Sequence, residues 1–298
     1  FSISVRSSDS YRSEGGLNVA GYLIVYPDFL SFLTFYLTLA KNLDAMEKIA
    51  FITGATAGIG KATAEILGIH NYNLILCGRR KERLEDLKED IHKVSDVDIL
   101  TFQLDVRNKE EVEKAVHNLP ADWKNIDVLV NNAGLAVGLD HIDKATVDDW
   151  ERMIDTNIKG LLYVTRAVSP YMVKNNRGHI INIASVAGKE VYENGNVYCA
   201  TKHAVDALSR AMRIDLLENR IKVTNIAPGL VDTEFSTVRF KGDKKRADNV
   251  YQGLTPLYAE DVAEAILFAV TRPAHVNIND LLIMPTDQAA AAIARREQ

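Results

Sequence analysis

The sequence predicts an α/β protein, in which helices cover both faces of a doubly wound parallel sheet within a single domain. Short apolar runs rich in β-branched residues alternate with helix-like segments from Lys48 onward, as expected for strands that are buried on both faces. No internal repeat or low-complexity linker divides residues 46–298, so we expect one domain there. The predicted strands are KIAFIT, NLILC, ILTFQ, VLVNN, HIINIA and KVTNIA.

The first 45 residues precede this pattern and have two interpretations. Residues 19–40 are apolar over about the length that crosses a bilayer, but Asp28 is costly in hydrocarbon. Residues 1–45 carry three basic and four acidic side chains, which supply no basic anchor for anionic lipid. Met46 stands directly before the first predicted strand. We therefore favour an N-terminal extension outside the fold over a membrane anchor.

The first strand ends in the glycine-rich turn TGATAGIG, residues 53–60, and a helix follows. Glycines allow a tight turn there and let backbone N–H groups approach a pyrophosphate at the positive end of the helix. This position after the first strand predicts a dinucleotide site in a Rossmann-type fold. The predicted cofactor contacts in this turn are Thr53, Gly54, Thr56, Gly58, Ile59 and Gly60.

The second strand ends in CGRR and predicts which dinucleotide binds. Arg79 and Arg80 stand where an acidic residue would favour NAD, and a guanidinium can bind a 2′-phosphate in bidentate fashion. The alternative is a solvated basic patch, RRKER. Cations crowded at the start of the helix near Lys81 are electrostatically unfavourable without an anion, so we expect NADP(H).

Three further segments are informative. The next helix carries Leu84, Leu87 and Ile91 on one face. Thr146 followed by Asp149 predicts a capping box at a long helix that begins near Val147. The mixed stretch of residues 229–257 interrupts the alternation before a helix begins near Ala259, and we expect it to be a substrate lid.

Taken together, the motifs resemble the short-chain dehydrogenase/reductase family over residues 46–298. A Tyr-x-x-x-Lys pair alone is weak evidence, because lysine is common. The order of the whole set carries the resemblance. It comprises TGxxxGxG, NNAG at residues 131–134, Asn157, Ser185, Tyr198 with Lys202, and Pro228-Gly229.

This resemblance implies a catalytic group of Asn157, Ser185, Tyr198 and Lys202. Tyr198 and Lys202 are four apart on a predicted helix, so we expect the ammonium to lower the pKa of the phenol. In the family, the tyrosine exchanges the proton of the alcohol, the serine hydrogen-bonds the substrate oxygen, and the lysine also binds the nicotinamide ribose. The position of Asn157 matches a family residue that holds a water.

Further cofactor contacts follow from the same resemblance. Asp105 and Val106, after the third strand, match the adenine contacts of the family. The other implied cofactor residues are Asn132, Ala133, Gly134, Tyr198, Lys202, Pro228, Gly229, Val231 and Thr233.

Several segments resemble the NADP-dependent 3-hydroxy acid dehydrogenases in particular, among them GRRKERLEDL, NNAGLAVG and APGLVDTEFSTVRFKGD. The implied substrate is a short 3-hydroxy acid such as serine, L-allo-threonine or 3-hydroxypropionate, bound at Ser185 and Tyr198. Arg239 is the preferred candidate for its carboxylate, with Lys241 as a second cation; the alternative is that both are charges on a surface loop. Two alternatives stay open: a reductase of another ketone, sugar or acyl thioester, and a non-catalytic NADP-binding sensor.

Composition excludes other classes of protein. The formal net charge of −5 argues against a nucleic-acid partner, and no cysteine or histidine spacing is typical of a metal site. We expect Cys77 and Cys199 to be packed thiols in a reducing compartment, which predicts a cytoplasmic enzyme without membrane attachment.

His203 adjoins Lys202, but neighbouring residues on a helix point in different directions, so we assign it no role. By analogy with the family, we expect a homotetramer or homodimer.

Overall fold

The computed structural model describes residues 17–19, 22–24 and 48–297, and the chain divides into two compact units, Phe1–Glu47 and Lys48–Gln298. In the first unit, β1 (Leu17–Val19) pairs antiparallel with β2 (Tyr22–Ile24). Most of the apolar stretch 19–40 lies outside the described residues. Within the described ranges, no helix combines the length and apolar character needed to cross a membrane.

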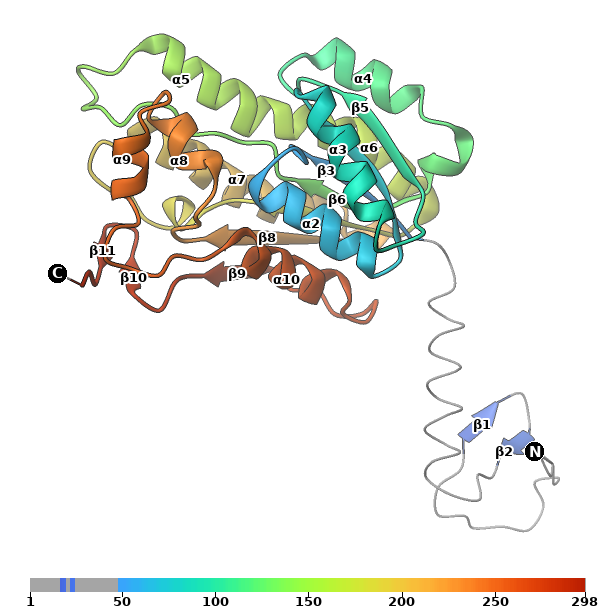
Figure 1. Cartoon of the computed structure of the whole chain (residues 1–298). Coiled ribbons are helices and arrows are strands. Elements are labelled where there is room, and N and C mark those ends of the chain that lie inside the picture. Colours follow the sequence, from blue (N-terminus) through green and yellow to red (C-terminus); the bar gives the residue numbers. More distant parts are fainter. Residues whose placement is uncertain (1–16, 20–21, 25–47, 298) are drawn as a thin grey trace. The chain divides into compact units, whose positions relative to one another are not determined.

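The second unit is built on a seven-stranded parallel sheet with the strand order β5-β4-β3-β6-β7-β8-β9 (Figure 1). From β3, the chain builds outward first to β4 and β5, and then from β6 in the other direction, which is doubly wound topology. The predicted fold class is therefore confirmed. The strands are β3 (Lys48–Thr53), β4 (Tyr72–Gly78), β5 (Ile99–Gln103), β6 (Ile126–Asn131), β7 (Gly178–Ile183), β8 (Ile221–Pro228) and β9 (Asp280–Ile283).

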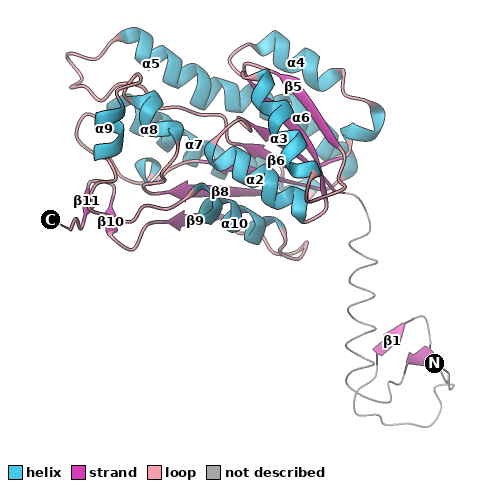
Figure 2. Ribbon diagram, in the orientation of Figure 1, coloured by secondary structure: helices cyan, strands magenta, loops and turns pink. Residues whose placement is uncertain are grey.

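Helices cover both faces of this sheet (Figure 2). One face packs against α2, α3 and α10, and the other against α4, α6 and α7. Alternate strand residues point to opposite faces: Ile52 joins the first core and Phe51 the second. The six helices are α2 (Gly58–Ile69), α3 (Lys81–His92), α4 (Lys109–His117), α6 (Leu161–Asn175), α7 (Asn196–Asp215) and α10 (Ala259–Val270).

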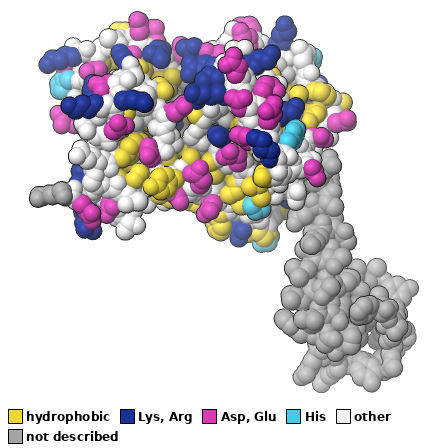
Figure 3. All heavy atoms as spheres, viewed as in Figure 1, with side chains coloured by type: hydrophobic (Ala, Val, Ile, Leu, Met, Phe, Trp, Pro, Cys, Tyr) yellow, Lys and Arg dark blue, Asp and Glu magenta, His cyan; other side chains and the backbone are white. Residues whose placement is uncertain are grey.

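The amphipathic pattern of α3 is confirmed, because Leu84, Leu87 and Ile91 are its buried residues. Acidic and basic side chains are interspersed on the face shown in Figure 3, so that face offers no continuous basic surface for a phosphate backbone.

The helix expected near Val147 is α5 (Val147–Ile154), but the predicted capping box does not form. Thr146 is the N-cap residue, yet its side chain makes no capping hydrogen bond. The carboxylate of Asp149 is instead bound by Lys241 Nζ at 2.7 Å. A single π-helical segment, Asp155–Gly160, joins α5 to α6.

The stretch of residues 229–257 contains two short helices, α8 (Glu234–Arg239) and α9 (Lys244–Asn249). Each has a side-chain cap at its start, from Thr233 and Asp243 respectively. After β9 the chain ends in the short antiparallel pair β10 (Gln288–Ala290) and β11 (Ile293–Ala294).

Candidate active site

A cleft runs along the carboxyl ends of the parallel strands, where ligands bind in open α/β sheets. Most of the predicted site residues line it. These are Gly54, Thr56, Gly58, Ile59, Arg79, Arg80, Asp105, Val106, Asn132, Ala133, Gly134, Ser185, Tyr198, Lys202, Pro228, Gly229, Val231 and Thr233.

Four predicted residues lie outside the lining of this cleft. Thr53 is buried beneath it, where its Oγ1 accepts hydrogen bonds from the backbone N–H groups of Asn132 and Ala133, both at 3.0 Å. Gly60 is also buried, and Asn157 lies behind Leu135. Arg239 lines a smaller neighbouring pocket, which shares Tyr198 with the cleft. Thr53 and Gly60 therefore support the site rather than face it.

The glycine-rich turn is shaped for a close backbone approach. Gly54 has φ +66°, and a Cβ there would lie 2.9 Å from the Cα of Ala133. A Cβ on Gly60 would lie 2.4 Å from the carbonyl oxygen of Gly54. No side chain caps the N-terminus of α2, and its first turn carries no acidic residue. The helix therefore presents N–H groups and a positive dipole end, which fit a dinucleotide pyrophosphate.

Tyr198 lies on α7 with 8% of its surface exposed. Its ring packs against that of Phe235, with the ring centroids 5.7 Å apart. Burial raises the pKa of Tyr198 above its usual value, while hydrogen bonding to Ser185 and the nearby Arg239 charge oppose that rise.

The prediction that Lys202 lowers the pKa of Tyr198 is wrong for this structure. Lys202 Nζ lies 5.9 Å from the Tyr198 ring centroid and donates a 2.8 Å hydrogen bond to the carbonyl of Ile183. Burial lowers the pKa of Lys202 to about 8. Desolvation therefore dominates both groups of the pair.

Ser185 follows β7 and begins the short 3₁₀ turn Val186–Gly188. Its Oγ accepts a 3.1 Å hydrogen bond from the N–H of Ala187 and donates to the carbonyl of Pro228 at 3.3 Å. These contacts direct a buried hydroxyl to the same cleft as Tyr198.

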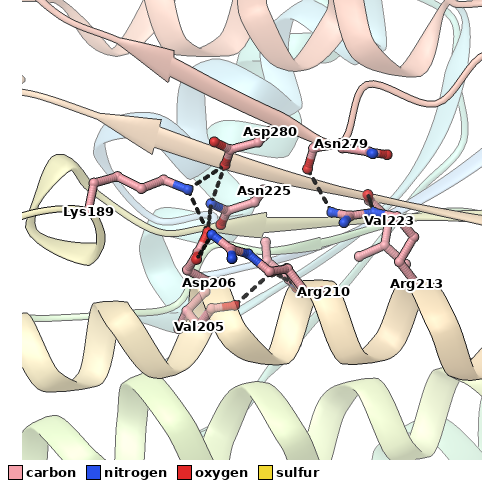
Figure 4. Close-up of polar contacts among 11 residues, drawn as sticks. Lys189, Val205, Asp206, Arg210, Arg213, Val223, Asn225, Asn279 and Asp280 are labelled. Atoms are coloured by element: carbon pink, nitrogen blue, oxygen red, sulfur yellow. Dashed lines mark hydrogen bonds and ion pairs between the residues drawn. The ribbon is translucent and has the colours of Figure 1, made fainter.

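A charged network anchors the segment after Ser185 to α7 (Figure 4). Lys189 Nζ lies 2.5 Å from Asp206 Oδ1 and 2.9 Å from Asp280 Oδ1. Asn225 Nδ2 donates to both carboxylates, at 3.1 and 2.7 Å. Because Asp206 lies one turn beyond Lys202 on α7, the network connects the Ser185 segment to the helix that carries Tyr198 and Lys202.

Asn157 occupies the π-helical segment and is almost completely buried. Its Nδ2 donates to the carbonyl of Leu135 at 2.8 Å and to Thr201 Oγ1 at 3.0 Å. Both amide hydrogens are thus used within the protein, which fixes α7 and the segment after β6 to the π-helix. The water-holding role implied for Asn157 stays a prediction.

The two arginines after β4 differ in their surroundings. Arg80 donates to Thr56 through Nε and Nη2, and its Nη1 lies 2.7 Å from Glu234 Oε2. Within the described part of the chain, the guanidinium of Arg79 makes no hydrogen bond or ion pair. Arg79 is therefore the more available of the two for a phosphate.

Asp105 forms an ion pair with Arg107, at 2.5 Å between Oδ2 and Nη2. This hydrogen bond lowers the pKa of the Asp105 carboxyl. The ion pair keeps the carboxylate at the end of the cleft expected to hold adenine.

Arg239 lies beside two tyrosines, Tyr192 and Tyr198, of which Tyr198 lines the smaller pocket. Its guanidinium carbon is 5.4 Å from the Tyr192 ring centroid and 5.5 Å from that of Tyr198, and Nη2 donates to Tyr192 Oη at 2.8 Å. Its buried Nε has no hydrogen-bond partner among the described residues. Lys241, the second candidate cation, is bound to Asp149 instead. This arrangement can hold an anion next to the phenol.

Sequence analysis missed Tyr192, Phe235 and Glu234, which join these contacts. Tyr192 belongs to no motif quoted above, and only its place between Ser185 and Tyr198 could have pointed to it. His203 Nδ1 donates a hydrogen bond to the carbonyl of Cys199, 2.9 Å away, so the ring is bound to the backbone of its own helix. Within the described residues, no group of three metal-ligating side chains could hold an ion.

Comparison with known proteins connects this geometry to a family. The model of the short chain dehydrogenase family matches residues 48–244. The chain is similar to the NADP-dependent 3-hydroxy acid dehydrogenase YdfG of Salmonella typhi, with 51% identity over 83% of this chain and 98% of that protein. It is also similar to sulfoacetaldehyde reductase 2 of Chromohalobacter salexigens, with 44% identity over 84% of this chain and 98% of that protein.

A solved structure has the same fold. The closed form of serine dehydrogenase complexed with NADP+ superposes with a TM-score of 0.79 and 50% identity. The match covers 84% of this chain and all of that one.

Proposed function

The chain belongs to the short-chain dehydrogenase family, and from that membership we propose that it transfers hydride between NADP(H) and the hydroxyl-bearing carbon of a short 3-hydroxy acid. It is an oxidoreductase that acts on CH–OH groups and uses NADP(H). Serine, L-allo-threonine and 3-hydroxypropionate are the proposed substrates. The observation that carries this choice is Arg239, whose guanidinium lies 5.5 Å from the Tyr198 ring centroid.

In the proposed mechanism, Tyr198 and Ser185 act on the substrate oxygen. The Ser185 hydroxyl turns from the Pro228 carbonyl to donate a hydrogen bond to that oxygen, and Tyr198 Oη gives it a proton in reduction or removes one in oxidation. When bound, NADP(H) supplies or accepts the hydride. Burial excludes water from the phenol, which strengthens the hydrogen bonds made there.

Lys202 and Gly134 support a ribose next to this pair. A Cβ on Gly134 would lie 3.6 Å from Lys202 Nζ, so glycine leaves space in front of the ammonium. With a pKa of about 8, Lys202 can take up or release a proton near neutral pH. We propose that it binds the ribose hydroxyls and that Asn157 supports the proton path behind it.

We assign the 2′-phosphate to Arg79 with Arg80, and the pyrophosphate to the turn from Gly54 to Gly60. The guanidinium donors of Arg79 have no partner among the described residues, and Arg80 is fixed by Thr56 beside it. The absence of an acidic residue at the end of β4 removes a group that would repel the phosphate.

A substrate panel tests this function. We expect NADP-coupled oxidation of L-serine, L-allo-threonine, 3-hydroxypropionate and 3-hydroxyisobutyrate, with kcat/KM higher than for matched alcohols without a carboxylate. Equal values for acids and neutral alcohols would contradict the assignment. In the same assay, NADPH should give a higher kcat/KM than NADH in the reverse direction.

A sulfonated aldehyde is a second candidate, because a relative at 44% identity is named a sulfoacetaldehyde reductase and Arg239 suits either anion. Adding sulfoacetaldehyde to the panel separates the two. A non-catalytic sensor is tested with Tyr198→Phe, which should bind NADPH normally but lose kcat by about 10²–10⁴. If the wild type were inactive on the whole panel, the sensor would be favoured.

We also propose a cytoplasmic homotetramer or homodimer, with residues 1–45 as an extension and 229–257 as the lid. Exposed Val147, Ile154 and Leu162 on α5 and α6 and Ile214 on α7 support contact between copies through these long helices. Light scattering tests the assembly, and N-terminal mass analysis of the native protein tests the extension.

A further inference from the structure

Helix α8 begins at Glu234 and ends at Arg239, and it contacts a different part of the site at each end. With only six residues, it forms a short rigid element between the two contacts. What holds its first residue therefore also affects where its last residue lies.

At the first end, the Glu234 carboxylate bridges two arginines from the β4–α3 corner. Its Oε2 lies 2.7 Å from Arg80 Nη1, and its Oε1 lies 2.6 Å from Arg83 Nη1. Hydrogen bonding to Arg80 lowers the pKa of this carboxyl, so it is ionised at neutral pH. The residues are about 150 apart in sequence, so the bridge joins the lid segment to the wall of the cofactor cleft.

Arg80 extends this bridge to the glycine-rich turn. It uses Nε and Nη2 on Thr56 while Nη1 binds Glu234. The Arg80 guanidinium therefore connects the glycine-rich turn, the end of β4 and α8. Glu234 itself lines the cleft beside Arg79 and Arg80.

At the other end, Arg239 donates to Tyr192 Oη at 2.8 Å, and its carbonyl accepts from the N–H of Gly138 at 2.9 Å. Phe235 packs against Tyr198 between the two ends. The residue proposed to bind the substrate anion thus belongs to the same helix as the bridge to the cofactor wall.

We propose that Glu234 is a positioning residue for substrate recognition: by binding Arg80 and Arg83, it fixes α8 so that Arg239 meets the substrate anion beside Tyr198. The assignment of Arg239 rests on the proposed function. The connection between the two walls rests on the Glu234 contacts alone.

The solvent exposure of Glu234, Arg80 and Arg83 limits how much loss of the bridge can change KM. The three side chains are 42–48% exposed, so solvent screens the pairs and each contributes little by itself. We expect loss of the bridge to raise KM for the hydroxy acid about fivefold. The kcat should change by less than about twofold, because Tyr198 and Ser185 keep their own contacts.

A double-mutant cycle tests the bridge in the full chain. Kinetics on the best 3-hydroxy acid, at saturating NADP+, are measured for wild type, Glu234→Gln, Arg83→Gln and the double variant. Arg83 lies outside the cleft lining, so its replacement breaks the Glu234–Arg83 ion pair without removing a cofactor contact. Each single variant should raise KM. Because Glu234→Gln already removes both ion pairs, the double variant should match Glu234→Gln. An unchanged KM in Glu234→Gln, or additive effects in the cycle, would overturn the proposal.

Lys81→Gln is the matched control, because Lys81 is an exposed cation in the same first turn of α3 that pairs with no carboxylate among the described residues. It should match wild type. A rise in KM equal to that of Arg83→Gln would mean that general loss of positive charge is responsible, which would also overturn the proposal.

Hydrogen exchange separates this inference from the proposed substrate. With NADPH and no substrate, backbone amides of residues 234–239 should be more protected in wild type than in Glu234→Gln, while amides of β6 exchange equally in both. Equal protection of residues 234–239 would refute the bridge. If protection differs but no hydroxy acid is oxidised, the bridge stands and the proposed substrate fails.

Discussion

The side-chain amide of Asn157 and the backbone of Leu135 are joined by two hydrogen bonds, each 2.8 Å long: the Leu135 N–H donates to Oδ1, and Nδ2 donates to the Leu135 carbonyl. Both residues are buried. The pair fixes the chain after β6 to the π-helical segment, directly behind Lys202 and the Gly134 position. Its loss would therefore affect both stability and catalysis.

We expect Asn157→Ala to lower the free energy of unfolding by about 2–4 kcal/mol, because both backbone groups of Leu135 would be left buried without partners. Urea denaturation measures the loss. Asn175→Ala is the control, since that amide makes only an exposed 3.3 Å contact with Asn125, and it should cost less than about 0.5 kcal/mol. Equal losses in the two variants would contradict this account of Asn157.

Arg239→Met should raise KM for a 3-hydroxy acid by about 10- to 100-fold, because a charge-assisted hydrogen bond to the carboxylate is lost. The methyl ester of the same substrate should be affected far less. Tyr192→Phe keeps the ring beside Arg239 but removes the 2.8 Å hydrogen bond, so it should give a smaller rise. Steady-state kinetics on acid and ester decide the point, and equal effects on both would remove Arg239 from carboxylate binding.

Asp206→Asn should destabilise the protein by about 2 kcal/mol, because Lys189 is only 19% exposed and its partner at 2.5 Å loses its negative charge. Asp280 still binds Lys189, which keeps the cost below that of a fully unpaired buried charge. Arg210→Met provides the comparison. Arg210 also binds Asp206, at 2.7 Å, but it is 68% exposed and should contribute less than about 0.5 kcal/mol. Thermal and urea unfolding of the two variants would show no such difference if the network were unimportant.

His179 should make the fold sensitive to acid. It is buried in β7 beside Thr224, and burial lowers its pKa from 6.5 to about 3. Between these values the unfolded chain binds a proton that the folded chain does not, so stability is full above pH 6.5 and falls as the pH decreases toward 3. Between pH 7 and pH 5, wild type should lose about 2 kcal/mol more than His179→Gln. Urea denaturation at pH 7 and pH 5 measures the loss. If the free energy of unfolding fell equally in wild type and His179→Gln, His179 would not be the cause.

Much of the fold and the cleft could be predicted because the relevant signals are local. Each parallel strand is a short apolar run, and the residues that follow it fall at one edge of the sheet. Gly54 and Arg79 come directly after a strand and Ser185 comes two residues after one, so their meeting in one cleft follows from topology alone.

The missed features depend on contacts between distant segments. Asp149 was expected to cap its own helix, but Lys241 binds it from 92 residues away in sequence. Glu234 finds Arg80 and Arg83 across about 150 residues. The pKa of Tyr198 depends on how deeply the phenol is buried, which its spacing from Lys202 does not reveal. Local patterns contain none of this information.

Burial of the two cysteines of the chain would allow a fluorescent label to be attached selectively within residues 229–257. Cys77 and Cys199 are at most 1% exposed, and burial raises the pKa of both thiols, that of Cys77 to about 12. Maleimide reagents attack exposed thiolates, so the native protein should be nearly inert toward them. A single cysteine introduced at exposed Lys245 on α9 would then take up a fluorophore with little background. A change in its emission on addition of NADPH or substrate would test whether residues 229–257 move as the proposed lid, without removal of either natural cysteine.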